Sequence, residues 1–179
     1  MLASAQSLSG DNGGGDTTLS LQRSGGSLQL AVFRSDRVRC AVPLACVEQV
    51  LPMMAVSPLP GAPRVVMGLL CLQGQLLPVV DLRRRLRLPD GEYGVAAHLL
   101  VLQTPRRRLA IATDEVQGVS EVDASSVAPA SAVLAAGGPM TGAVSVSDGI
   151  LLIHDIEAFL SQEEESQLTE ATRETEPSR

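Results

Sequence analysis

The sequence predicts an all-β protein with short helices, and three features of the chain support this fold class. Its apolar residues occur in short runs that end at Gly or Pro, which is typical of buried strands joined by tight turns. Some of these runs recur further along the chain in the same order. Apolar residues make up 45% of the 179 positions, so the chain can bury one sizeable core or two small cores that share a seam.

The recurring unit is most evident in residues 65–86, VVMGLLCLQGQLLPVVDLRRRL, which match the chain 74 positions further on without a gap. A second segment, residues 33–50, matches residues 102–119 at a displacement of 69. Apolar residues fall on apolar residues in both matches, and the two matches occur in the same order along the chain. We therefore predict a duplicated β unit.

A glycine and an aspartate occupy equivalent positions in the two matching segments. Gly68 falls on Gly142, and Asp81 falls on Asp155. Each Asp follows a predicted strand, where its side chain can accept hydrogen bonds from the free N–H groups of the next turn. Asp81 and Asp155 are therefore predicted to be the N-caps of equivalent helical turns.

The predicted elements follow from local patterning. Alternating apolar residues indicate strands, and Gly, Pro or Asp clusters indicate turns. The segment Cys46–Leu51 fits either a bent strand or a helical turn. The predicted strands are 28–33, 38–44, the two runs on either side of Gln73–Gln75, 98–102, 109–112 and the hairpin that ends at Asp155.

Composition divides the chain into three parts. Residues 1–26 are rich in Ser, Gly and Gln and are predicted to be a flexible leader, and residues 27–162 form the globular part. After Leu160 we predict a polar helical extension that frays, so residues 163–179 are assigned as an acidic disordered tail. No run approaches the roughly 20 apolar residues that a membrane helix needs, so we predict a cytoplasmic protein without membrane insertion.

Metal and cofactor sites are not indicated. Cys40, Cys46 and Cys71 have no C-x-x-C spacing and lie in apolar segments, which favours reduced core thiols. His98 and His154 stand beside apolar strand residues and are predicted to be structural. We therefore expect neither a metal ion nor a cofactor.

The sequence also lacks the patterns of an enzyme. It contains no glycine-rich phosphate loop before a helix and no G-x-S-x-G elbow. The adjacent carboxylates Asp114 and Glu115 would point to opposite faces of a strand. We therefore predict a protein that is not an enzyme, although a small enzyme with an unrecognised site is a further alternative.

Two arginine runs raise the alternative of a nucleic-acid-binding β-barrel module. Residues 83–85 and 106–108 are all Arg, but aromatic residues make up only 2% of the chain. Proteins that bind single strands stack bases on aromatic side chains, so we interpret both runs as solvated faces. The net charge of −6 resides largely after residue 160, and the nearly neutral globular part does not favour a nucleic-acid partner.

Four motifs together resemble the CheW-like domain family across residues 28–160. They are F-x-x-x-x-x-x-C-A-V-P-L-x-x-V-x-x-V from Phe33, P-L-P-x-A-P-x-x-V-x-G from Pro58, L-x-G-x-x-L-P-V-V-D-L-R from Leu72, and the closing hairpin. The resemblance implies two SH3-like, five-stranded β-barrel subdomains packed on a shared apolar core. It also implies a non-catalytic adaptor that couples chemoreceptor tips to a CheA-type histidine kinase in a chemosensory array.

In this family the receptor's helical tip binds in the groove between the subdomains, and the kinase regulatory domain binds barrel to barrel. The chain departs from the family where N-L-R-G is replaced by Cys71-Leu72-Gln73-Gly74 and where V-x-E-[IV] is replaced by Val47-Glu48-Gln49-Val50. These departures suggest a divergent array that serves surface or pilus-based motility. By resemblance, the expected receptor-groove residues are Val47, Glu48, Gln49, Val50, Gly68, Leu72, Gln73 and Gly74.

Overall fold

The computed structural model describes residues 26–132 and 139–175. Except for Gly26, the predicted leader lies outside the described residues. The strands are β1 (Ser27–Ser35), β2 (Val38–Pro43), β3 (Val47–Pro52), β4 (Val66–Leu72), β5 (Gln75–Asp81), β6 (His98–Gln103), β7 (Arg108–Thr113), β8 (Glu115–Asp123), β9 (Ala128–Pro129), β10 (Met140–Val146) and β11 (Gly149–His154). The helices are η1 (Leu44–Cys46), α1 (Leu82–Arg85), η2 (Ala124–Ser126), η3 (Ala130–Ala132), η4 (Ile156–Ala158) and α2 (Gln162–Thr175).

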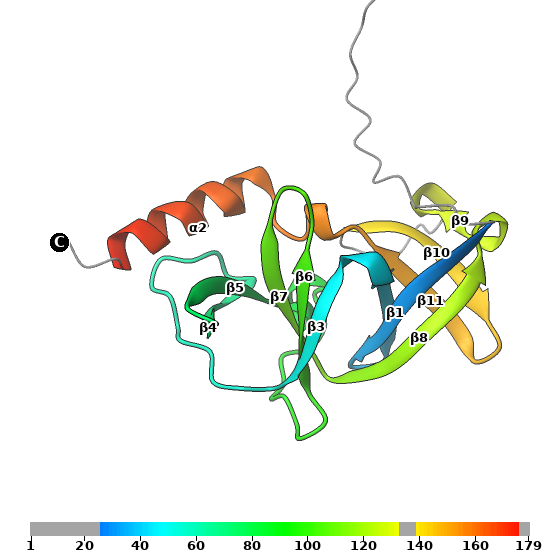
Figure 1. The fold of residues 1–179 in the computed structure, drawn as a ribbon, viewed down its shortest axis with the longest axis horizontal. Helices are drawn as coiled ribbons and strands as arrows, with labels where there is room; N and C mark the ends of the chain where they lie inside the picture. The colour runs from blue at the N-terminus through cyan, green and yellow to red at the C-terminus, as the bar shows by residue number, and fades with distance from the viewer. Residues whose placement is uncertain (1–25, 133–138, 176–179) are drawn as a thin grey trace, which may run out of the picture.

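The strands form two sheets that lie side by side (Figure 1). The sheet with the order β8-β1-β2-β11-β10-β9 is called barrel A, and the sheet with the order β3-β6-β7-β5-β4 is called barrel B. Barrel B uses one continuous stretch, residues 47–113, while barrel A takes strands from before and after that stretch. This architecture confirms the predicted all-β fold with short helices.

The duplication appears in the order and register of both sheets. Displacing β1, β2 and β3 by 69 residues gives β6, β7 and β8, and displacing β4 and β5 by 74 gives β10 and β11. The order of barrel B then becomes the order of barrel A without its short strand β9. The parallel pairs also agree, because Ala110 lies opposite Val79 while the equivalent Ala41 lies opposite Ile153. The predicted duplication is therefore confirmed.

The two copies exchange their first hairpins, which the sequence analysis did not predict. The hairpin β1–β2 of the first copy joins β8, β10 and β11 of the second copy in barrel A. The hairpin β6–β7 of the second copy joins β3, β4 and β5 of the first copy in barrel B. The chain crosses between the barrels after β2 and again between β7 and β8, so neither barrel is formed by one copy alone.

The equivalent glycines lie where another segment crosses the hairpin backbone. A Cβ at Gly68 would collide with the carbonyl oxygen of Ser57, and a Cβ at Gly142 would lie 2.6 Å from the carbonyl oxygen of Ala128. Gly68 also has a φ of +153°, which side-chain-bearing residues rarely adopt. A ladder irregularity adjoins the glycine in both hairpins. Gly68 and Gly142 are thus required by the close approach of backbone.

The predicted caps are present at the end of each copy. An Asp81 Oδ1 atom accepts a hydrogen bond from the Arg84 N–H at 3.2 Å at the start of α1. Asp155 Oδ1 accepts one from the Glu157 N–H at 2.9 Å at the start of η4. Each carboxylate satisfies a backbone donor that a helix start would otherwise leave free.

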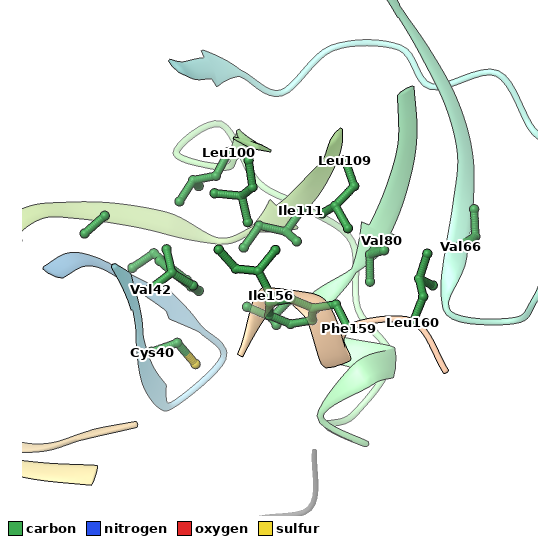
Figure 2. Packing of buried hydrophobic residues seen from close by; sticks show 14 residues of the cluster. Cys40, Val42, Val66, Val80, Leu100, Leu109, Ile111, Ile156, Phe159 and Leu160 are labelled. Atoms are coloured by element: carbon green, nitrogen blue, oxygen red, sulfur yellow. The ribbon is translucent and has the colours of Figure 1, made fainter. Parts of the chain in front are cut away.

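Three large apolar clusters fill the two barrels and the seam between them. One cluster fills barrel A, with Leu30 and Leu151 among its members, and another fills barrel B, with Val79 and Leu99. The third, which we call the seam core, lies between the barrels (Figure 2). Its buried members are Ala31, Phe33, Cys40, Val42, Val66, Val80, Leu82, Leu100, Leu102, Leu109, Ile111, Ile156, Phe159 and Leu160. In Figure 2, Ile156 and Phe159 lie between the strands of the two barrels.

A polar cluster beside the second crossing joins the two barrels. Asp114 Oδ1 accepts from Arg83 Nη2 at 2.6 Å, and Asp114 Oδ2 accepts from the Asp36 N–H at 2.6 Å. Asp36 belongs to the β1–β2 turn of barrel A, and Arg83 follows the last strand of the barrel B hairpin. Tyr93 donates to Asp81 Oδ1 at 2.7 Å, and its ring lies 5.5 Å from the Arg83 guanidinium carbon. Asp114 therefore binds a group from each barrel at the crossing.

Two sequence expectations change. The ambiguous segment around Cys46–Leu51 is a 3-10 turn, η1, followed by the strand β3. The expectation of a disordered tail over 163–179 is wrong for residues 163–175, which belong to α2. The physical reason is that Leu168 and Ala171 pack in a small apolar cluster with Leu59 and Leu69, so the helix has a docking face despite its acidic composition. Within the described residues, no helix is long and apolar enough to cross a membrane.

Candidate functional site

The expected receptor-facing residues of β3 lie at the edge of barrel B. Val47 pairs with Leu102 and Val50 pairs with Leu100, so both valines lie on the seam side of the sheet. Val47 is half-buried against the seam core, whereas Val50 is 43% exposed. Gln49 pairs with Val101, whose side chain is in the interior of barrel B. The segment thus presents Val50 to solvent.

The second expected segment is the turn between β4 and β5. Leu72 packs on the interior cluster of barrel B, while Gln73 and Gly74 are exposed. The φ angles of Gln73 and Gly74 are +52° and +79°, the pair of positive values that a tight two-residue hairpin turn requires. Leu72 and Val50 therefore lie on different faces of the sheet and do not form one apolar surface. Gly68 is buried against Ser57, so its position has a packing role.

Arg108 connects these two segments at the end of barrel B. Its Nε and Nη2 atoms donate to the two carboxylate oxygens of Glu48 at 2.7 and 2.5 Å, and its Nη1 donates to Gln75 Oε1 at 2.5 Å. The hydrogen bond from Arg108 lowers the pKa of the Glu48 carboxyl. We call Glu48, Gln75 and Arg108 rim B. Local sequence patterns did not indicate this role of Arg108, although the arginine run at 106–108 was a signal that charge is concentrated there.

The same bridge exists at the end of barrel A. Arg39 is the equivalent of Arg108 at a displacement of 69, and Gln117 is the equivalent of Glu48. Arg39 Nε donates to Gln117 Oε1 at 3.0 Å, and Arg39 Nη1 lies 2.8 Å from Asp148 Oδ1 in the β10–β11 turn. We call Arg39, Gln117 and Asp148 rim A. An arginine thus links the edge strand to the hairpin turn in each barrel.

Exposed apolar side chains also occur in equivalent pairs near the rims. Val50 of β3 corresponds to Val119 of β8, which is 62% exposed. Leu76 of β5, 54% exposed, corresponds to Ile150 of β11, 63% exposed. Large apolar side chains are therefore exposed at equivalent positions of the two barrels.

The arginine runs are occupied within the molecule, which weighs against a nucleic-acid surface. Arg83 pairs with Asp114, and Arg85 pairs with Glu164 at 2.7 Å. Arg107 and Arg108 likewise pair with glutamates. Neutralised guanidinium groups release few counterions from a phosphate backbone and contribute little to affinity for it.

The three cysteines differ in burial: Cys40 is buried, Cys46 is half-buried, and Cys71 is exposed rather than the core thiol expected from the sequence. Burial raises the pKa of the Cys40 thiol to about 12 and that of Cys46 above its usual value, which leaves both as thiols. His154 is buried with its Nδ1 atom 3.0 Å from the carbonyl oxygen of Pro139, and burial lowers its pKa to about 4. In the described part of the chain, no group of three or more His, Cys, Asp or Glu side chains is placed to hold a metal ion.

Comparison with known proteins agrees with this geometry. Residues 29–164 match the CheW-like domain. The chain is 28% identical over 104 residues to the chemotaxis protein CheW of Rhizobium meliloti, covering 58% of this chain and 67% of that protein. It is 31% identical over 97 residues to protein FrzA of Myxococcus xanthus (54% of this chain, 61% of that protein). It is 25% identical over 138 residues to the chemotaxis protein CheW of Klebsiella aerogenes (76% and 83%).

The fold has a counterpart among solved structures. The crystal structure of the scaffolding protein TtCheW from Thermoanaerobacter tengcongensis superposes with a TM-score of 0.68 at 18% identity, covering 72% of this chain and 89% of that one. At this identity the likeness concerns the fold, which is the arrangement of two barrels around a seam described above. The family match spans most of the globular part, from β1 to the first turn of α2. The chain therefore belongs to the CheW-like domain family.

Proposed function

We propose that this chain is a non-catalytic scaffold that couples the cytoplasmic helical tips of chemoreceptors to a CheA-type histidine kinase. The observation that supports this function best is the presence of two equivalent rims, one on each barrel, with exposed apolar residues beside them. A coupling protein must bind two partners at once, and two separate surfaces meet that need. The proposal places the protein in the cytoplasm, recruited to receptor arrays at the membrane.

The receptor tip is assigned to rim B and the neighbouring edge of β3. A helix docking there would contact Val50 with an apolar side chain and would meet Glu48 and Gln73 with its polar flank. In such helix-in-groove contacts, apolar anchors supply affinity and polar groups at the border supply selectivity. Because Glu48 neutralises Arg108, rim B offers little net positive charge to an acidic tip. We therefore expect its own receptor to differ at the tip from one that pairs with an arginine.

The kinase regulatory domain is assigned to rim A. Val119 and Ile150 stand beside this rim at the positions equivalent to Val50 and Leu76. A regulatory domain built from similar barrels could pair end to end with barrel A while the receptor tip occupies barrel B. The proposal includes the type of motility: the array that this chain joins would serve surface or pilus-based movement.

The test is a titration of the purified chain against both partners from the same organism. Val50→Asp should weaken binding of the receptor tip several-fold to hundred-fold, about 1–3 kcal/mol, because it places a charge in a partly desolvated contact. Ile150→Asp should weaken binding of the kinase domain and leave receptor binding unchanged. Each variant is the matched control of the other, and circular dichroism verifies that both are folded.

A third variant tests selectivity. Gln73→Arg should strengthen binding to a conventional chemoreceptor tip and should spare or weaken binding to the chain's own receptor, because Arg supplies a fixed charged fork that Gln lacks. Unchanged receptor affinity in a folded Val50→Asp protein would mean that the tip docks elsewhere. Salt-dependent retention of the chain on a polyanion column would instead favour the nucleic-acid alternative.

A further inference from the structure

Helix α2 contacts barrel B through a narrow apolar stripe. Ala171 is buried and Leu168 is half-buried, and the pair packs against Leu59 and Leu69 at the connector and on β4. The residues around Leu168 on α2, from 166 to 170, are otherwise exposed. Figure 1 shows α2 as a single helix lying along one side of barrel B and reaching away from barrel A. Two side chains thus supply most of its apolar contact.

Charge supplies the rest of the attachment. Arg85 Nη1 lies 2.7 Å from Glu164 Oε2, and Arg107 pairs with Glu165. The side chain of Arg107 is only 11% exposed, yet within the described residues its Nη1 has no hydrogen-bond partner. The first turn of α2 is therefore held by Arg85 and Arg107. Arg107 could donate a further hydrogen bond through its Nη1 atom.

The helix also fills its site incompletely. A cavity of about 270 Å³, open to solvent on one side, lies beside α2 and the sheet. Pro78, Leu109 and Leu160 form its apolar wall. The other lining residues are Glu165, Leu168 and Thr169 of the helix and the arginines Arg107 and Arg108. A helix with a bulkier apolar side chain at the position of Thr169 would bury more surface there than α2 does.

We propose that the face of barrel B beneath α2 is a docking site for an acidic amphipathic helix of a partner protein, which binds in exchange with α2. The chemistry of the occupant follows from the site, which combines an apolar wall with the cations Arg85 and Arg107. α2 itself is an acidic helix seated on it, with three consecutive glutamates in its first turn. The cavity shares Arg108 with rim B, but its apolar wall and the cations Arg85 and Arg107 belong to neither rim. The inference therefore goes beyond the proposed coupling function.

The experiment uses the full chain and a fluorescent peptide with the sequence of residues 159–175 carrying Thr169→Leu. Leu168→Asp combined with Ala171→Asp releases α2 in the chain, and Glu164→Arg combined with Glu165→Arg releases it without changing the apolar stripe. A tethered helix competes at a high effective concentration, so both released proteins should bind the peptide at least tenfold more tightly than the unmodified chain. Gln167→Asp, at an exposed position of α2, is the matched control and should leave peptide binding unchanged.

Two peptides define the chemistry of the site. The peptide with the original Thr169 should bind the released proteins several-fold more weakly than the Thr169→Leu peptide, because it leaves the cavity unfilled. A Thr169→Leu peptide in which Glu164 and Glu165 are also replaced by arginine should bind the released proteins at least tenfold more weakly. If the released proteins and the unmodified chain bound the Thr169→Leu peptide with equal affinity, the proposal would be overturned. Dimerisation of the released proteins without peptide binding would also overturn it, since the face would then pair with a second copy.

Discussion

Asp114 illustrates how one side chain can set the relation between two barrels. Its carboxylate binds Arg83 of the barrel B side and the backbone of Asp36 in barrel A, and its side chain is 11% exposed. Burial alone would raise the pKa of Asp114, but the hydrogen bonds from Arg83 and from the Asp36 N–H outweigh it and hold the pKa below its ordinary value of 3.8. The charged form is therefore the one that the fold stabilises.

Asp114→Asn should lower the free energy of unfolding at neutral pH by about 2 kcal/mol, since it weakens a mostly buried charged pair. A carboxyl whose pKa is lower in the folded state stabilises the fold at pH values above its unfolded-state pKa. This stabilisation is lost as the pH falls through the folded-state pKa. The difference between the two proteins should therefore shrink below about pH 4. Urea titrations over a pH series measure this difference. Glu115→Gln, in a pair with Arg34 that is more exposed than the Asp114–Arg83 pair, is the control that should change little. A difference that stays constant across the series would contradict this assignment.

The equivalent glycines give a second prediction at this scale. Gly68→Ala and Gly142→Ala should each destabilise the protein by about 1–3 kcal/mol, because the new methyl group meets a carbonyl oxygen of the crossing segment. Gly94→Ala is the matched control, since its Cβ would meet nothing within 4 Å. Denaturant midpoints measure all three. A loss of stability in Gly68→Ala without any loss in Gly142→Ala would show that the two crossings are not equivalent.

At the scale of elements, the strands and caps could be predicted from local patterns, but the partners of the strands could not. Apolar alternation defines a strand without defining its neighbour, so the exchange of the β1–β2 and β6–β7 hairpins was invisible in the sequence. For the same reason Arg108 was assigned to a solvated face, although it joins Glu48 to Gln75 across the sheet. The groove residues of β3 and of the β4–β5 turn were assigned by resemblance and stay a prediction. The structure adds that Leu72 packs on the interior cluster of barrel B, a placement that depends on strand register and that the sequence did not define.

A polar helical extension was predicted after Leu160, but the length of α2 and its docking on barrel B were missed for a different reason. Its glutamates gave the composition of a disordered tail, and only two apolar residues marked the docking face. A local signal was present in Ser161-Gln162-Glu163-Glu164, which has the S-x-x-E spacing of a capping box. In the structure, Glu164 N donates to Ser161 Oγ at 3.2 Å and Ser161 N donates to Glu164 Oε2 at 2.8 Å. A reciprocal cap of this kind starts a helix even in a polar segment.

Ser161→Ala should therefore lower the free energy of unfolding by about 1 kcal/mol, the usual cost of losing an N-cap side chain. Ser166→Ala is the matched control, because the Ser166 hydroxyl only donates to the Gln162 carbonyl within the helix. Thermal unfolding of both variants, followed by circular dichroism, compares them. Equal midpoints for the two variants would mean that α2 adds nothing to the stability of barrel B.

At the scale of the whole molecule, the exchanged hairpins and the seam core make the two barrels dependent on each other. Barrel A contains strands from both ends of the globular part, so it cannot close before barrel B has been synthesised. The seam core takes buried residues from both sheets and from the segment that follows β11. Cooperative unfolding is expected when one core supports two sheets, because loss of that core removes the packing surface of each.

Phe159 tests this dependence most directly. It is fully buried in the seam core and lies beside Ile156 between the strands of the two barrels (Figure 2). Phe159→Ala should cost about 3–5 kcal/mol, the range for emptying a buried aromatic site. Amide hydrogen exchange should then show protection falling by the same factor in β1 and β2 as in β6 and β7, because both hairpins pack on the same cluster. Phe33→Ala, at a buried seam position on the barrel A side, should give the same uniform loss. If β6 and β7 kept full protection while β1 and β2 lost it, the barrels would be separate folding units, and the seam would serve only to join them.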